Sequence, residues 1–164
     1  MGRRMALAAE WRSEVAIENR ALDGLCALAV AATRGDAAVV TVLRHGRHHV
    51  LGAAGTVCQS LPESLTDTCG ADIAERHGLR AAAASQALPL SEGFDSALVL
   101  PLWQRGAQVG VVALLARQGL GAFTPDERAV AMRLRHLAEA QIGAEAVLDT
   151  VLRVAMGRTE AWRH

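Results

Sequence analysis

One hairpin constrains the fold of this chain more than any other feature of its sequence. Residues 96–103 and 108–117 are strongly apolar and are joined by a short turn through an Arg-Gly pair at 105–106, which is the pattern of a β-hairpin. In the second strand, neighbours such as Val111 and Val112 are both apolar, so both faces of the strand are apolar. A strand of this kind is usually central and covered on both sides. The sequence therefore predicts a sheet with this strand inside it.

A helix and a second hairpin are predicted upstream. Residues 6–33 carry apolar side chains at helical spacing, and the Arg-Gly-Asp sequence at 34–36 ends the helix and turns the chain. Residues 37–44 are rich in Val and Thr, residues 45–47 form a turn, and residues 48–57 return along the first strand. This order places an antiparallel pair of strands directly after the first helix.

The stretch between the two hairpins carries weaker signals. Ser60 and Glu63 form a capping box, which indicates the start of a short helix. A second short helix is expected over residues 71–77 and should end at Gly78. Residues 79–84 are interpreted as a short strand. We therefore expect this stretch to consist mainly of short helices.

The last helix has the clearest start signal in the chain. Thr124 is suited to the N-cap, Pro125 to the first helical position, and Glu127 to the third, where its charge favours the helix dipole. The pattern that follows predicts one long amphipathic helix. Its apolar stripe alternates steps of four and three residues, as a heptad repeat does, through Val130, Leu134, Leu137, Gln141, Ala144, Leu148, Val151 and Ala155.

This heptad stripe has two interpretations. A terminal helix must bury one stripe against its own sheet, and in the first interpretation the heptad stripe serves only that purpose. In the second, it is too long for one domain to cover, and an exposed stripe of that length favours aggregation. Pairing with a second copy of the chain removes this problem, so we favour a homodimer. Its contacts are expected at Leu134, Leu137, Gln141, Leu148 and Val151.

Composition limits the classes of function. The 164 residues have the length of one domain. The 17 basic residues, all of them Arg, balance 17 acidic residues, which argues against nucleic acid or an anionic membrane as a partner. No apolar run reaches the roughly 18–20 residues of a membrane span, and the N-terminus lacks the pattern of a signal peptide. Because the three cysteines also suit a reducing compartment, we expect a cytoplasmic protein.

The order of elements predicts an α+β fold in which an antiparallel sheet carries helices on one face. Residues 1–36 are assigned to an N-terminal helix that joins a dimer bundle. Residues 37–144 are assigned to the core with the sheet, and residues 145–164 to an extension of the last helix. No internal repeat or low-complexity linker is visible in the sequence.

Four motifs, taken in order, resemble the GAF family. Residues 96–102 (Ser-Ala-Leu-Val-Leu-Pro-Leu) resemble its S-x-L-x-V-P-L strand, and residues 105–114 resemble its G-x-x-I-G-V-L-x-L strand. Residues 123–127 resemble its F-S/T-x-x-D/E helix start, and residues 69–74 are similar to its C-G-x-A helix opening. The resemblance implies an antiparallel sheet of five or six strands with the N- and C-terminal helices on one face. On the other face, the segment between the hairpins would enclose a pocket.

GAF domains bind small molecules such as cyclic nucleotides, bilins, haem or small anions, or bind nothing and only dimerise. The resemblance therefore implies an unknown small molecule as ligand and requires no cofactor. Haem and bilin are disfavoured, because the covering segment at 58–95 is short and no Cys-His pair stands where bilin-binding members attach the chromophore. The residue set of cyclic-nucleotide members is incomplete, since lysine is absent. The expected pocket residues are Cys58, Cys69, His77, Phe94 and Ser96.

Cys58 and Cys69 are also candidates for redox chemistry. The free methionine-(R)-sulfoxide reductase, an enzyme with the GAF fold, uses cysteines near these two positions. Its attacking cysteine, however, lies just before the S-x-L-x-V-P-L strand, where residues 91–95 of this chain contain no thiol. Such an enzyme needs one thiolate to attack the sulfoxide and a second thiol to resolve the adduct. The alternatives are redox sensing through the pair, or buried structural cysteines such as Cys26, which is expected in the core.

The sequence thus favours a regulatory domain that catalyses nothing. No metal site is expected, because His45, His48 and His49 lie at a hairpin tip, where adjacent strand residues point to opposite faces. A small ligand or a redox change would alter the pocket, and the terminal helices would pass that change across a homodimer to an unknown downstream protein. The alternatives are an enzyme like the reductase and a dimerisation platform without a ligand.

Overall fold

The computed structural model describes residues 20–55, 72–78, 94–117 and 119–161. The expected start of the first helix, the capping box at Ser60 and Glu63 and the expected strand at 79–84 lie outside these residues. The described elements are α2 (Arg20–Ala31), β1 (Ala37–Arg44), β2 (Arg47–Gly55), β3 (Ala74–Arg76), β4 (Ser96–Gln104), β5 (Ala107–Ala116) and α5 (Pro125–Ala161).

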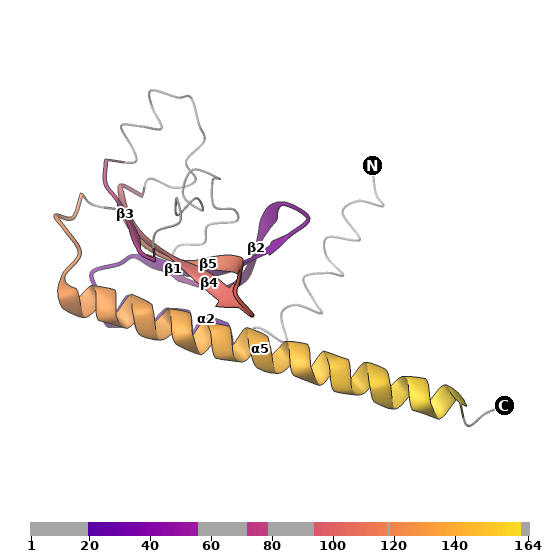
Figure 1. Cartoon of the computed structure of the whole chain (residues 1–164). Helices are drawn as coiled ribbons and strands as arrows, with labels where there is room; N and C mark the ends of the chain where they lie inside the picture. The colour runs from indigo at the N-terminus through magenta and orange to yellow at the C-terminus, as the bar shows by residue number, and fades with distance from the viewer. Residues whose placement is uncertain (1–19, 56–71, 79–93, 118, 162–164) are drawn as a thin grey trace, which may run out of the picture.

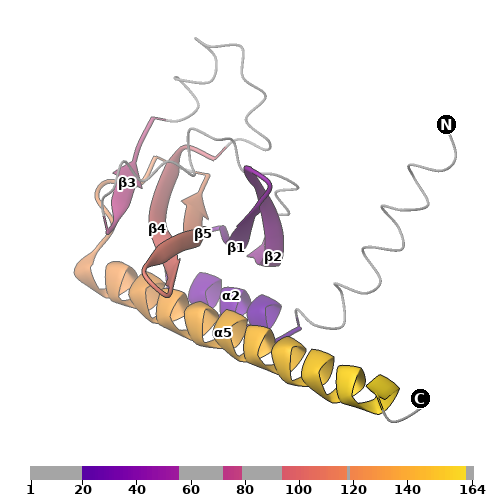
Figure 2. The ribbon, with the colours of Figure 1, turned by 45° about the vertical axis from the view of Figure 1, so that its right-hand side comes forward.

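The five strands form one antiparallel sheet (Figure 1), in the order β2-β1-β5-β4-β3 that Figure 2 shows from β2 on the right to β3 on the left. Helix α2 contacts β1 and β2, whereas α5 contacts β4 and β5. The two helices lie side by side on one face of the sheet (Figure 2). The predicted α+β class, with an antiparallel sheet and terminal helices on one face, is confirmed.

β5 is the central strand, as its apolar sequence predicts. It pairs with β1 on one side and with β4 on the other. Val111 and Val112 point to opposite faces, and both are 0% exposed. A strand that buries both faces can use apolar residues without a break, which explains why the sequence shows no alternation here.

Both predicted hairpins form, each with a two-residue turn. His45 and Gly46 join β1 to β2, and Arg105 and Gly106 join β4 to β5. All four residues have positive φ, at 52° and 73° in the first turn and 51° and 79° in the second. Turns of this hand match the right-handed twist of the strands. The first turn is one residue shorter than predicted, because Arg47 already belongs to β2.

The prediction of a helix over residues 71–77 is wrong. Residues 74–76 instead form β3, with Ala74 opposite Val99 and Arg76 opposite Ala97 on the edge of β4. Local signals favoured a helix, but the free edge of β4 offers backbone hydrogen bonds to an extended chain, and this tertiary pairing overrides the local preference. Gly78 therefore does not end a helix, although it has a positive φ of 66°.

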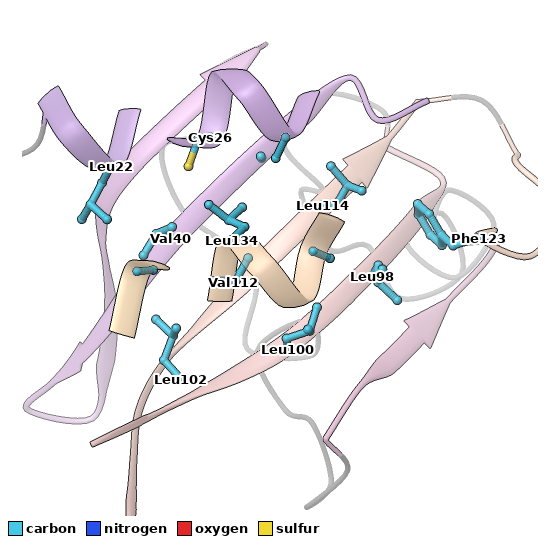
Figure 3. Packing of buried hydrophobic residues seen from close by; sticks show 14 residues of the cluster. Leu22, Cys26, Val40, Leu98, Leu100, Leu102, Val112, Leu114, Phe123 and Leu134 are labelled. Carbon is cyan, nitrogen blue, oxygen red and sulfur yellow. The ribbon is translucent and has the colours of Figure 1, made fainter. Parts of the chain in front are cut away.

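The sheet separates two apolar clusters. On the side of the helices, Leu98 and Leu100 of β4 and Val112 of β5 pack with Leu22 and Leu134 from the two helices (Figure 3). The opposite face has smaller residues in a second buried cluster. Its members are Ala37, Val39, Phe94, Ala97, Val99, Val111, Ala113 and Leu115, none of them more than 3% exposed.

Helix α5 begins at the predicted cap. The Thr124 hydroxyl accepts a hydrogen bond from the Glu127 amide at 3.2 Å, and the Glu127 carboxylate accepts one from the Thr124 amide at 2.8 Å. This reciprocal pair satisfies two amides that a helix start leaves without partners. The helix then runs through residue 144 without a break and continues well past the edge of the sheet (Figure 1). Neither α2 nor α5 combines the length and apolar character that crossing a membrane requires.

Candidate functional site

Three of the five predicted pocket residues fall within the described ranges. His77 and Ser96 lie together, with 3.1 Å between the His77 Nδ1 and the Ser96 Oγ. Phe94 is 3% exposed, and the guanidinium carbon of Arg117 lies 5.9 Å from the centre of its ring. Cys58 and Cys69 lie outside the described residues, so their roles stay predictions.

Phe94 and Ser96 lie on different sides of the sheet. Phe94 belongs to the cluster on the face away from the helices. Ser96 and Leu98 are two residues apart on β4, so their side chains point to the same face of the sheet, and Leu98 faces the helices. The contact of His77 with Ser96 therefore belongs to the helix side. The pocket itself stays a prediction.

Glu75 of β3 is a site residue that the sequence did not reveal. Its Oε1 accepts a hydrogen bond from the Phe123 amide at 2.9 Å and lies 2.7 Å from the His77 Nε2. Its Oε2 binds the Arg128 guanidinium in the first turns of α5. No sequence signal pointed to this residue. In the predicted helix over residues 71–77, its carboxylate would have been an ordinary charged group exposed to solvent.

The surroundings of Glu75 keep it ionised. Burial alone would raise the pKa of Glu75, but the hydrogen bond from the Phe123 amide, together with His77 and Arg128, holds that pKa below its ordinary value. The His77 ring also stacks on Phe123, with 6.2 Å between the ring centres and 30° between the planes. Glu75 thus joins β3 to the residues around the start of α5.

The contacts Ser96–His77–Glu75 have the order of a nucleophile, a base and an orienting carboxylate. A nucleophile must reach its substrate, but Ser96 is 0% exposed. The three residues therefore form a hydrogen-bonded link between β3 and β4, in which Ser96 is buried and His77 is exposed. Within the described ranges, no group of three or more His, Cys, Asp or Glu residues is arranged to hold a metal ion.

The predicted dimer residues divide into two groups. Leu134 is 3% exposed and packs in the chain's own core, so its assignment to the dimer contact is wrong. Leu137, Leu148 and Val151 are 51%, 59% and 57% exposed. Gln141 is half-buried and donates to the Glu145 carboxylate at 3.0 Å. The reason is geometric, because the buried face of α5 runs through Ala131, Leu134 and Ala138 and leaves Leu137 outside it, whereas Leu148 and Val151 lie beyond the sheet.

Comparison with known proteins supports the fold. Neither a protein-family model nor a curated protein matches the sequence. Among solved structures, the GAF domain of a phosphoenolpyruvate-protein phosphotransferase from Acinetobacter is similar. Its TM-score is 0.63 at 16% identity, and the match covers 90% of this chain and 96% of that domain.

Two further structures are similar over most of their length. The type II free methionine-R-sulfoxide reductase from Thermoplasma acidophilum has a TM-score of 0.61 at 15% identity, covering 78% of this chain and 94% of the enzyme. A GAF domain region from Geobacter sulfurreducens PCA has a TM-score of 0.58 at 18% identity, covering 84% of this chain and 99% of that region. At this level of identity the similarity concerns the fold. The order of the strands, the placement of both helices on one face and the similarity to these solved structures together show that the chain has a GAF-like fold.

Proposed function

We propose that this chain is a regulatory GAF-like domain that senses a small ligand or a redox change and signals through paired α5 helices, without catalysis. The observation that carries this proposal is the exposed apolar surface of α5 beyond the sheet. A domain of a two-component sensor histidine kinase from Sinorhizobium meliloti 1021, which is similar in structure with a TM-score of 0.60 at 14% identity, supports a sensory role by analogy.

The exposed surface of α5 fits a second copy of the same helix. Leu148 and Val151 continue the heptad stripe with more than half of each side chain exposed. Val147, Leu152 and Val154 flank them and are 59%, 52% and 56% exposed. Large apolar side chains gathered on a projecting helix mark an interaction site. A heptad stripe is self-complementary, since two copies interlock side chain by side chain. We therefore assign a second α5 as the occupant.

The mass in solution tests this dimer. Light scattering after size exclusion should give twice the chain mass of 17.3 kDa. Leu148→Glu places a charge in the dimer contact and should give the single-chain mass. Ala146→Glu is the matched control, because Ala146 is exposed on the opposite side of α5 and should leave the dimer intact. A wild type of single-chain mass at micromolar concentration would contradict the dimer.

The melting temperature tests ligand sensing. A ligand that binds only the folded chain stabilises it by RT ln(1 + [L]/Kd), which is about 2.7 kcal/mol at a hundred times Kd. A dimerisation platform without a ligand predicts no change with any compound in a small-molecule library. Redox sensing predicts a shift between reduced and mildly oxidised protein that Cys58→Ser with Cys69→Ser abolishes.

The second candidate is a methionine sulfoxide reductase. It is favoured by the similarity to the Thermoplasma acidophilum enzyme, with a TM-score of 0.61. Against it stands the absence of a thiol at 91–95. The enzyme would consume free methionine-(R)-sulfoxide in a dithiol-coupled assay, and Cys69→Ser would abolish this consumption whereas Cys26→Ser would not. No turnover by the wild type ends this candidate.

A further inference from the structure

We propose that Glu75 couples the position of β3 to the start of α5, as a positioning residue for the signalling helix. The inference rests on the proposed function, because it takes α5 as the output. It names the contact through which a change in the sheet would reach that helix.

The first support is the ring of contacts around the start of α5. Glu75 accepts the Phe123 amide with one carboxylate oxygen and binds Arg128 with the other. Arg128 in turn donates from its Nε to the Phe123 carbonyl at 3.3 Å. The three residues close a loop, so Glu75 fixes both the chain that enters α5 and a side chain of its first turns. The Glu75 side chain is 15% exposed and the Arg128 side chain is 40% exposed, so the contact is partly shielded from water.

The second support is the position of β3. It has three residues and, among the described strands, is the edge strand that pairs with β4 alone. In the sequence it stands between the two stretches, 58–73 and 77–95, that the resemblance places over the pocket. A strand within that stretch would move with the predicted pocket cover. Its short ladder also costs little to rearrange, because few backbone hydrogen bonds hold it.

The third support is the register of β3 on β4, in which Glu75 stands opposite Leu98 and faces the helices. Successive side chains of a strand point to opposite faces, so a shift of one residue moves every side chain to the other face. Such a shift of β3 would turn Glu75 away from the helices and release the Phe123 amide and Arg128 together. A one-residue shift would give β3 a second register that no longer holds α5, and an element with two such arrangements can couple two sites.

Hydrogen exchange on the full chain tests this coupling. Glu75→Gln keeps the size of the side chain but removes its charge. It should raise exchange by about tenfold both in β3 and at residues 127–131 of α5, as expected for the loss of a charge-assisted hydrogen bond. Coupling is reciprocal, so Arg128→Gln should raise exchange in β3 although it lies on α5. Circular dichroism establishes that each variant is folded, and Arg128→Lys is a milder replacement if Arg128→Gln is not.

A matched control separates coupling from general loosening. Glu139 of α5 accepts the Trp103 amide of β4 at 2.9 Å, so Glu139→Gln alters another carboxylate contact between helix and sheet. It should leave exchange in β3 and at the start of α5 unchanged. The coupling is overturned if Arg128→Gln leaves β3 as protected as in the wild type, or if Glu75→Gln loosens β3 alone. The mass measurement reports the dimer separately, so failure of the coupling and failure of the proposed function are distinguishable.

Discussion

Arg34 and Glu127 join the end of α2 to the first turn of α5. The Glu127 Oε1 accepts the Arg34 amide at 3.0 Å and the Arg34 Nε at 2.8 Å, while Oε2 accepts the Arg34 Nη2 at 2.7 Å. The Glu127 side chain is 7% exposed. Because Glu127 also accepts the Thr124 amide, one carboxylate both caps α5 and holds it against the neighbouring helix.

Glu127 should make the protein sensitive to acid. The hydrogen bond from the Arg34 side chain outweighs burial and lowers the pKa of Glu127 from 4.5 to about 2. A carboxyl with a lower pKa in the folded state stabilises the fold above its unfolded pKa, and this stabilisation is lost as the pH falls from about 5 toward 2. We expect a loss of about 2–3 kcal/mol over that range, which denaturant titrations at stepped pH would measure.

Glu127→Gln is the control for this acid sensitivity. The amide cannot titrate, so the variant should be less stable at pH 7 and should lose less stability on acidification. Part of the acid loss should remain, because the pKa of Glu75 is also lowered. If the free energy of unfolding of Glu127→Gln fell with pH as steeply as that of the wild type, the Glu127 carboxylate would not be the group responsible.

Leu134 and Leu137 should respond differently to truncation. Leu134→Ala opens a cavity in the core and should reduce the free energy of unfolding by about 2–5 kcal/mol. Leu137→Ala removes a side chain that is 51% exposed and should cost under about 1 kcal/mol. Denaturant titrations in the Leu148→Glu background would compare the two without the contribution of dimer formation. Equal losses would mean that Leu137 is buried within the single chain.

Gly110 and Gly24 form a second matched pair. A Cβ on Gly110 would lie 1.9 Å from the Thr41 carbonyl oxygen on the neighbouring strand, so Gly110→Ala should destabilise the fold by ~3 kcal/mol. Gly24 lies inside α2, and nothing lies within 4 Å of its added Cβ. Gly24→Ala should therefore stabilise the protein by up to ~1 kcal/mol. Thermal melts would show opposite shifts, and a neutral Gly110→Ala would contradict the close strand approach.

Cys26 should be chemically inert in the folded protein. It is 0% exposed in the core, and burial raises the pKa of its thiol to about 12. Since the thiolate is the reactive form, a variant with Cys58→Ser and Cys69→Ser should not react with a thiol reagent at pH 8 until denaturant is added. Labelling of the native variant within minutes would place Cys26 outside the core.

The parts of the fold that the sequence could predict are those fixed by neighbours along the chain. Each hairpin depends on its own turn, where His45 and Arg105 stand before a glycine and adopt positive φ. The start of α5 depends on Thr124 and Glu127, three residues apart. Cys26 could be placed in the core because the helical spacing of its own segment identified the buried face.

The parts that could not be predicted depend on segments far apart in the sequence. A strand of three residues has no periodicity to recognise, and β3 exists because β4 presents a free edge beside it. Glu75 acquires its partners, Phe123 and Arg128, only after that pairing is made. The heptad stripe likewise gave no sign of which of its residues face the sheet, and only the packing shows that Leu134 and Ala138 are buried while Leu137 is not.

The unbroken course of α5 fixes an angular relationship between the sheet and the projecting end of the helix. Each residue advances a helix by about 100° and 1.5 Å, so the azimuth of Leu148 is set by the number of residues that separate it from Leu134. Adding or removing one residue between them would rotate the distal surface by more than a quarter of a circle relative to the sheet. The number of residues in α5 between Leu134 and Leu148 therefore sets the direction in which the exposed apolar surface faces relative to the sheet.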